Sequence, residues 1–221
     1  MPTAAEETYE RLYAAFGPQG WWPADSPLEV MVGAVLVQNT SWRNVERAIA
    51  GIRARQMLDL RQLLQTTDGE LAALIHPAGP PRVKARRLRS LLECFSERYN
   101  GSIEAMQQAD PETLRDELLD VHGVGPETAD SILLYALGHP VMVVDAYTLR
   151  VWARHGWVEP HARYHDLQKK LTDELPRDAD IYNELHALIV EVGKRFCGKT
   201  PKCEQCPLQN MLPEGGVVGD R

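Results

Sequence analysis

The sequence of 221 residues lacks a long hydrophobic run, an excess of positive charge and a large set of cysteines. No run approaches the roughly 18 apolar residues that a membrane-spanning helix needs, so we expect no membrane segment. The net charge of −7 argues against a protein that binds nucleic acid over its whole surface, although a local basic patch can still contact phosphates. The N-terminus has no signal-peptide layout, and we therefore expect a cytoplasmic protein whose four cysteines are thiols or metal ligands.

Apolar residues at helical spacing dominate what is present. The hydrophobic share of 44% is enough for one large domain or two small ones. Residues 82–99, 126–137 and 180–196 are among the ranges that read as helices. Residues 141–144 are apolar and β-branched, as in a strand, but they are too isolated to make a sheet. The pattern predicts an all-α fold.

Gly123 and Gly125 enclose a short turn between two predicted helices. Glycine lets the backbone come close to a ligand, and the helix that begins at Pro126 presents free N–H groups to an anion. A phosphate suits this site, and Thr128 in the first helical turn strengthens the interpretation. The alternative is a plain linker in which glycine only ends the first helix.

The stretch 118–130 resembles the helix-hairpin-helix of the endonuclease III superfamily of DNA base-excision glycosylases. A second stretch, 143–151, is similar to the apolar segment with an aspartate that follows the hairpin in that family. The resemblance covers nearly the whole chain and implies that Gly123, Gly125 and Thr128 contact DNA.

The same resemblance implies two helical lobes with a DNA-binding cleft between them. One lobe is expected to span residues 28–139 and to end in the helix-hairpin-helix. The other is expected to combine residues 1–27 with residues 140–221, which include a cysteine loop. The expected partner is double-stranded DNA that contains a damaged base, and the expected protein is a monomer that associates with the nucleoid when it binds DNA.

Asp145 falls at the position of the family's catalytic aspartate. Cleavage of an N-glycosidic bond gives the sugar oxocarbenium character, which a fixed carboxylate stabilises. The carboxylate can also orient or deprotonate the attacking water. The alternative is that Asp145 merely caps the next helix, and both roles are compatible.

Glu127 stands where bifunctional members of the superfamily carry a lysine that forms a Schiff base with the sugar. Because a carboxylate cannot form an imine, we expect a monofunctional enzyme that leaves an abasic site. Two alternatives remain open at this point. One is an endonuclease III-like glycosylase and lyase that acts on oxidised pyrimidines through another lysine. The other is a helix-hairpin-helix protein that binds DNA without catalysis.

Three residues are candidates for handling the flipped base. Gln38 matches the family residue that fills the gap in the duplex, and its alternative is an ordinary amide at a helix end. The faces of Trp21 and Trp22 would attract a cationic ring, although core packing is the commoner role of a single tryptophan. The Trp-Trp-Pro sequence and residues 37–42 resemble the 3-methyladenine DNA glycosylase III branch, which implies an alkylated purine such as 3-methyladenine. Enzymes that remove uracil or thymine from mismatches can also lack the lysine.

Five cations crowd a predicted helix at residues 82–89, namely Arg82, Lys84, Arg86, Arg87 and Arg89. The usual explanation of such a run is a solvated face. Residues 83–85 resemble a second backbone-contacting element of the family, so Lys84 and Arg86 are expected to contact DNA phosphates.

Cys197, Cys203 and Cys206 have a spacing that resembles the C-terminal [4Fe–4S] loop of the family. The fourth cysteine would fall at Leu212, which cannot bind a metal. A cluster with another fourth ligand, a zinc ion with another donor and a metal-free remnant are all compatible with the sequence. The expectation is a [4Fe–4S] cluster whose fourth ligand is unknown.

Overall fold

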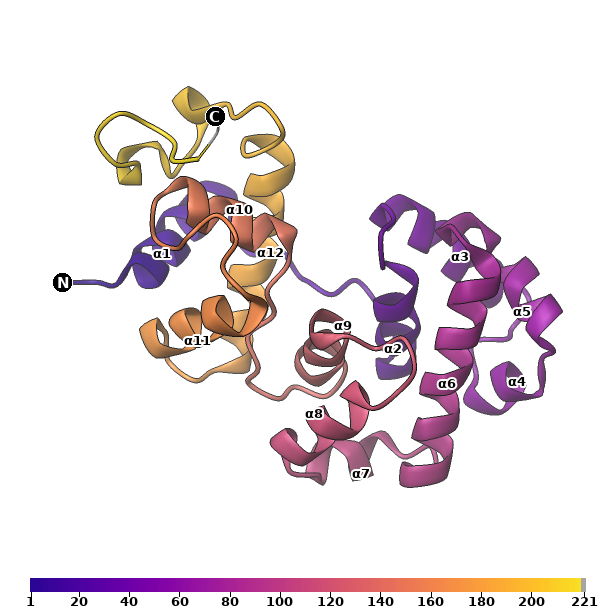
Figure 1. Cartoon of the computed structure of the whole chain (residues 1–221). Helices are drawn as coiled ribbons and strands as arrows, with labels where there is room; N and C mark the ends of the chain where they lie inside the picture. The colour runs from indigo at the N-terminus through magenta and orange to yellow at the C-terminus, as the bar shows by residue number, and fades with distance from the viewer. Residues whose placement is uncertain (220–221) are drawn as a thin grey trace. The chain divides into compact units, whose positions relative to one another are not determined.

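The computed structural model describes residues 1–219 and is built from helices (Figure 1). In this part of the chain no strand forms, and the only bridge of β type joins Cys197 and Pro201. The predicted all-α fold is confirmed. Residues 141–144, the candidate strand, form neither a helix nor a strand. No helix of residues 1–219 combines the length and apolar character needed to cross a membrane.

The α-helices of the described chain are α1 (Ala4–Phe16), α2 (Pro27–Leu36), α3 (Trp42–Ala54), α4 (Leu60–Gln65), α5 (Asp68–Leu74), α6 (Pro81–Tyr99), α7 (Ile103–Gln108), α8 (Pro111–Leu119), α9 (Pro126–Ser131), α10 (Ala146–Arg154), α11 (Tyr164–Glu174) and α12 (Ala179–Arg195). Short 3₁₀ turns are η1 (His76–Ala78), η3 (Cys203–Gln205) and η4 (Gln209–Met211). A π-helical segment, η2 (Ile132–Ala136), directly follows α9.

The chain divides into two compact units. The central unit comprises residues 22–139, and the terminal unit comprises residues 1–21 together with residues from 140 onward. The central unit therefore begins at Trp22 rather than at residue 28. The reason is packing, since a Cβ atom at Gly33 of α2 would lie 3.1 Å from Cζ2 of Trp22. This close approach attaches Trp22 to the central unit.

The centre of the central unit is α2, whose residues from Glu29 to Leu36 are all buried. This helix is apolar nearly all round, and such a helix is stable only when neighbours cover every face. Helices α3, α6 and α9 and the π-helical η2 pack against it. The Ser26 hydroxyl caps the start of α2 by accepting a hydrogen bond from the Glu29 N–H group.

The terminal unit is organised around α12, which packs against α1 and α10 (Figure 1). Asp178 caps the start of α12, and Trp152 of α10 is fully buried. Gly193 of α12 has no room for a side chain because the Tyr147 ring of α10 lies directly against its backbone. The tight contact fixes the start of α10 beside α12.

Candidate functional site

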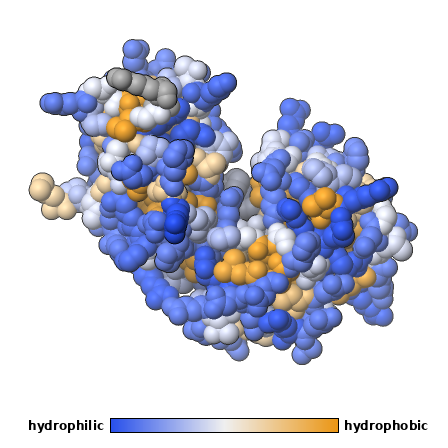
Figure 2. All heavy atoms as spheres, viewed as in Figure 1, coloured by the Kyte–Doolittle hydropathy of each residue, from blue (hydrophilic) through white to orange (hydrophobic). Residues whose placement is uncertain are grey.

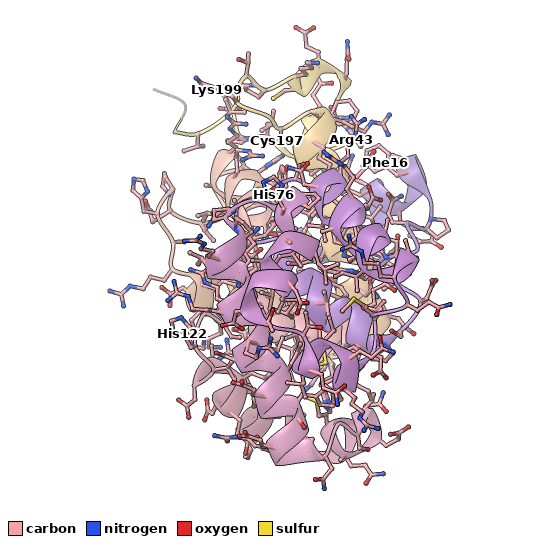
Figure 3. All side chains as sticks on the ribbon, turned by 90° about the vertical axis from the view of Figure 1, so that its right-hand side faces the viewer. Phe16, Arg43, His76, His122, Cys197 and Lys199 are labelled. Carbon is pink, nitrogen blue, oxygen red and sulfur yellow. The ribbon has the colours of Figure 1, made fainter. Side chains whose placement is uncertain are left out.

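The turn between α8 and α9 has the backbone that the two glycines predict; His122 within this loop is labelled in Figure 3. Gly123 has a φ of +85°, and a Cβ atom there would overlap the side chain of Arg87. Both facts require glycine. Gly125 is the N-cap of α9, supplies no capping side chain and has open space where a Cβ atom would be. The start of α9 is therefore accessible to a ligand from outside.

Gln38, directly after α2, is bonded to this turn. Its Nε2 atom donates to the Gly123 carbonyl and to Oγ1 of Thr128, each over 3.0 Å. Its Oε1 atom accepts a 2.6 Å hydrogen bond from Arg87 of α6. The predicted role of Gln38 in the duplex gap stays a prediction. In the structure of the free chain, this amide joins three segments that are far apart in sequence.

A cavity of about 160 Å³ lies beside the turn, within the central unit. Its lining includes Gln38, Asn39, Glu127 and Thr128. Asn39 has a left-handed backbone with a φ of 53°, which turns the chain sharply after α2. Glu127, at the position of the family's lysine, thus borders a hollow next to the hairpin.

The five cations at residues 82–89 of α6 differ in their contacts. Arg82 and Arg86 are exposed, as phosphate contacts need to be. Arg87 is bonded to Gln38, and Arg89 donates to backbone carbonyls of residues 63, 64 and 66. A solvated helix face therefore accounts for Arg82 and Arg86 but not for Arg87 and Arg89.

Lys84 does not lie on the surface. It is 3% exposed, and its ammonium donates to the carbonyls of Leu36 and Ala78 over 2.7 and 2.6 Å. Burial lowers the pKa of Lys84, and the nearby Arg87 adds to the shift. The expectation that Lys84 contacts DNA is corrected, because the spacing of charges along a helix does not show which side chain turns inward. Lys84 instead bonds the last turn of α2.

The two neighbouring tryptophans belong to different compact units. Trp21 lies in the terminal unit, where Nζ of Lys194 is 5.9 Å from the centre of its ring. Trp22 lies in the central unit and packs against the rings of Trp42 and Tyr135, at 4.9 and 5.2 Å between centroids. Trp22 is therefore part of an aromatic cluster rather than one half of an open pair.

A second cavity of the central unit, of about 420 Å³, adjoins that aromatic cluster. Its lining includes Pro23, Trp42, Glu46 and Arg53. The buried carboxylate of Glu29 also borders it and is paired with Arg53. Sequence reasoning quoted Trp42 within a family-like stretch but assigned it no role. Only the structure shows that Trp42, at the start of α3, lines a cavity together with Glu46 and Arg53.

Asp145 is the N-cap of α10 and also a buried carboxylate. Its Oδ1 atom accepts hydrogen bonds from the Thr148 N–H and hydroxyl groups, over 2.8 and 2.9 Å. Its side chain is only 13% exposed. Burial by itself raises the pKa of Asp145, but His186 and the two Thr148 donors together hold that pKa below its ordinary value of 3.8. The carboxylate is consequently ionised at neutral pH.

His186 of α12 is the residue near Asp145 that sequence reasoning missed. Its Nε2 atom lies 3.7 Å from Oδ2 of Asp145, and its side chain is 8% exposed. In the sequence this histidine stands among apolar residues of a helix, which is the ordinary pattern of a core position. Nothing in that pattern indicates a contact with a residue 41 positions earlier (186 − 145).

The cysteine loop brings its three thiols to one small cavity of the terminal unit; Cys197 and Lys199 of this loop are labelled in Figure 3. Cys197, Cys203 and Cys206 line a cavity of about 20 Å³, and Leu212 borders the same space. A cavity of that size holds about one water molecule. Burial raises the pKa of the Cys206 thiol, and the other two thiols raise it further.

These residues do not fit the [4Fe–4S] cluster that the resemblance implies. Within residues 1–219, no group of three or more His, Cys, Asp or Glu side chains is arranged to hold a metal ion. The Cys197 sulfur accepts a 3.3 Å hydrogen bond from Arg154, and an apolar Leu212 takes the place of a fourth ligand. Cys94 belongs to the central unit and so is no part of this loop.

Comparison of the chain with known proteins identifies one family. Residues 32–177 match the family described as HhH-GPD superfamily base excision DNA repair protein. The relative named "Putative DNA repair glycosylase MJ1434" from Methanocaldococcus jannaschii is 46% identical over 205 residues, which are 92% of this chain and 93% of the relative.

Two solved structures have the same fold. The Helicobacter pylori 3-methyladenine DNA glycosylase MagIII, bound to 1,N6-ethenoadenine, has a TM-score of 0.72 and 27% identity over 85% of this chain and 97% of its own. A non-covalent endonuclease III–DNA complex has a TM-score of 0.80 and 24% identity over 95% of this chain and 94% of its own.

Proposed function

The chain belongs to the HhH-GPD superfamily of base excision DNA repair proteins, and we propose that it is a monofunctional glycosylase that removes an alkylated purine. It is a base excision repair DNA glycosylase. The observation that carries the proposal is the buried, ionised carboxylate of Asp145, held by Thr148 at the start of α10. Other residues support two further parts of the proposal, namely the class of base that is removed and the abasic site that is left.

Asp145 acts on the sugar. As the N-glycosidic bond breaks, its electron pair leaves with the base, and positive charge develops on the deoxyribose. The ionised carboxylate stabilises that charge, and it accepts the proton from the water that attacks C1′. A base that already carries a positive charge leaves as a neutral molecule. The enzyme then needs no strong acid to protonate it.

Glu127 supports a reaction that stops at the abasic site. It is exposed on the first turn of α9 and borders the cavity beside the hairpin. A carboxylate at this position leaves the sugar without the amine that a Schiff base requires. Treatment of a reacting mixture with borohydride is therefore expected to trap no covalent protein–DNA adduct. A trapped adduct would instead support the endonuclease III-like alternative with lyase activity.

The cavity of the central unit that Trp42 and Glu46 line supports an electron-poor, cationic base as the substrate. Trp42 offers a ring next to the carboxylate of Glu46, and both attract positive charge. The structure of MagIII, named as a 3-methyladenine DNA glycosylase, is consistent with this class of base. Replacement of Trp42 by Ala is expected to weaken excision of 3-methyladenine more than that of uracil.

Contact with the DNA backbone is proposed for the hairpin and for the exposed cations of α6. Gly125 leaves the start of α9 open, and Arg82 and Arg86 extend into solvent. Backbone N–H groups at a helix start and arginine side chains are both common phosphate contacts. The partner is double-stranded DNA with a damaged base, bound by one copy of the chain.

The cysteine loop is proposed to keep its shape without a cluster. Arg154 donates to Cys197 Sγ and to the carbonyls of Gly198 and Lys199, and Arg150 donates to the Cys197 carbonyl. These contacts support a loop stabilised by protein groups alone. Iron and sulfide analysis of protein purified without oxygen is the test. Four irons and four sulfides per chain would contradict the proposal.

The experiment that tests the function is a panel of lesions in duplex DNA. The panel includes 3-methyladenine, 1,N6-ethenoadenine, uracil, thymine opposite guanine and an oxidised pyrimidine, each assayed with and without alkaline strand cleavage. We expect release of the alkylated purines and strand breaks only after alkali. Equal, negligible release by wild type and by Asp145→Asn over the whole panel would favour a DNA-binding protein without catalysis.

A further inference from the structure

His186 and Asp145 meet inside the terminal unit, where α12 packs against α10 (Figure 1). The two side chains are 8% and 13% exposed, and Nε2 of His186 is 3.7 Å from Oδ2 of Asp145. That separation is longer than a hydrogen bond. A small movement of either side chain would make it a direct bond.

The two oxygens of Asp145 have different surroundings. Oδ1 accepts from both donors of Thr148, which fixes that oxygen at the start of α10. Oδ2 faces the imidazole of His186. Contacts on Oδ1 alone would let the carboxylate plane rotate about the bonded oxygen. A donor on Oδ2 removes this freedom and defines which lone pair is presented to a substrate.

We propose that His186 is a positioning residue for the glycosylase reaction, which orients the Asp145 carboxylate by donating its Nε2–H group to Oδ2. The inference rests on the proposed function and extends it to a residue on another helix. Catalytic hydrogen bonds are often long in a free enzyme and shorten in the complex with substrate, which accounts for the 3.7 Å separation. His186 itself does not touch the reacting atoms. Its effect is on the rate of the chemical step and not on the affinity for DNA.

Two amide variants separate this role from simple core packing. In His186→Gln the side-chain nitrogen reaches approximately the place of Nε2, whereas in His186→Asn it reaches only the place of Nδ1. Both variants are polar, and both leave out the imidazole ring. If the ring serves only to fill the core, the longer and the shorter amide should not differ in the chemical step.

The matched control is His155, a second buried histidine of the terminal unit. It is 8% exposed and ends α10, where its Nδ1 atom lies 2.7 Å from the Val151 carbonyl. His155→Gln and His155→Asn should change thermal stability without any selective change in the excision rate. They therefore report what the loss of a buried imidazole costs at the opposite end of α10 from the carboxylate of Asp145.

The measurement is single-turnover excision of 3-methyladenine with enzyme in excess, alongside the Kd for duplex DNA with an abasic-site analogue and the Tm of each variant. We expect His186→Asn to slow excision by about tenfold, as for the loss of about one charge-assisted hydrogen bond, with Kd unchanged. We expect His186→Gln to stay within about threefold of wild type.

The proposal is overturned if excision is slowed equally in the two His186 variants or in neither of them. It is also overturned if the slower excision is accompanied by a matching loss of DNA affinity or of thermal stability. In each of these cases wild type is still active, so the proposed function stands. If wild type and Asp145→Asn are equally inactive on every lesion, the proposed function fails, and the inference fails with it. A His186→Asn variant that does not fold leaves the comparison of His186→Gln with both His155 variants. In that case a slowing of about tenfold by His186→Gln, with unchanged Kd and no such slowing in the His155 variants, would contradict the expected near-wild-type rate of His186→Gln.

Discussion

The polar side chains around the hairpin of the central unit and around Asp145 of the terminal unit are held in different ways. In the central unit Gln38 bonds to the Gly123 carbonyl and to Arg87, which holds the hairpin. Lys84 bonds to the carbonyls of Leu36 and Ala78, which holds the end of α2. In the terminal unit Asp145 uses one oxygen to cap α10 through Thr148, and its other oxygen faces the side chain of His186. The difference agrees with the proposed roles, in which the central unit binds the DNA strand and Asp145 acts in bond cleavage. The face of the molecule drawn in Figure 2 is mostly hydrophilic.

The largest effect is expected from the terminal unit, with Asp145→Asn. Asparagine can still cap α10, but it has no charge to stabilise the sugar. We expect single-turnover excision to fall by at least about 100-fold, while the Kd for abasic-analogue DNA stays within about threefold. A variant that lost affinity and rate together would break the division between the two units.

In the central unit, Gly123→Ala is expected to have the largest effect. The φ of +85° and the overlap with Arg87 make alanine costly at this position. We expect a loss of about 1–3 kcal/mol in the free energy of unfolding and weaker DNA binding. Gly125→Ala is the control, because its φ is −102° and its Cβ atom has no close neighbour in the free protein. That variant should keep its stability in urea unfolding and lose only DNA affinity.

Lys84→Met tests whether the buried cation of α6 is structural. The substitution leaves the carbonyls of Leu36 and Ala78 without their donor, and we expect it to lower the free energy of unfolding by about 1–3 kcal/mol. The dependence of DNA affinity on salt should not change. A weaker salt dependence in Lys84→Met would instead indicate that Lys84 contacts DNA.

Arg86→Ala is the matched substitution on the exposed face of the same helix. Loss of one phosphate contact should reduce the slope of log Kd against log salt by about one. Unfolding by urea should be unaffected, because the side chain is in solvent. An unchanged slope would remove Arg86 from the proposed DNA-binding surface.

The smallest effect expected is a pH dependence of stability in the terminal unit. Asp145 has a folded pKa below 3.8, so its charge stabilises the fold above that pH, and this contribution is lost as the pH falls through the lower folded value. The difference in Tm between wild type and Asp145→Asn should therefore be greatest near neutral pH and should shrink in acid. A difference that grows below pH 3.8 would contradict the sign of the shift.

Sequence reasoning was most informative where the chemistry is local. The hairpin is a short segment whose glycines, proline and apolar flanks specify its backbone, and Asp145 follows an apolar stretch and caps the next helix as expected. It was least informative for α6, where the sequence does not show which of five neighbouring cations are exposed and which are buried. One of them, Lys84, is buried, and only Arg82 and Arg86 are exposed. Trp21 and Trp22 likewise read as a pair in the sequence, whereas the structure assigns them to different compact units.

What the sequence by itself determined is therefore the all-helical architecture, the hairpin and the position of one carboxylate, since all three depend on periodicity and on residues a few positions apart. Only the tertiary structure decided that Gln38 and Arg87 hold the hairpin, that Trp42 borders a cavity with Glu46, and that His186 faces Asp145. These contacts join residues from different helices. Which side chains meet across two helices depends on how the helices pack, and the order of residues along either helix does not specify that packing.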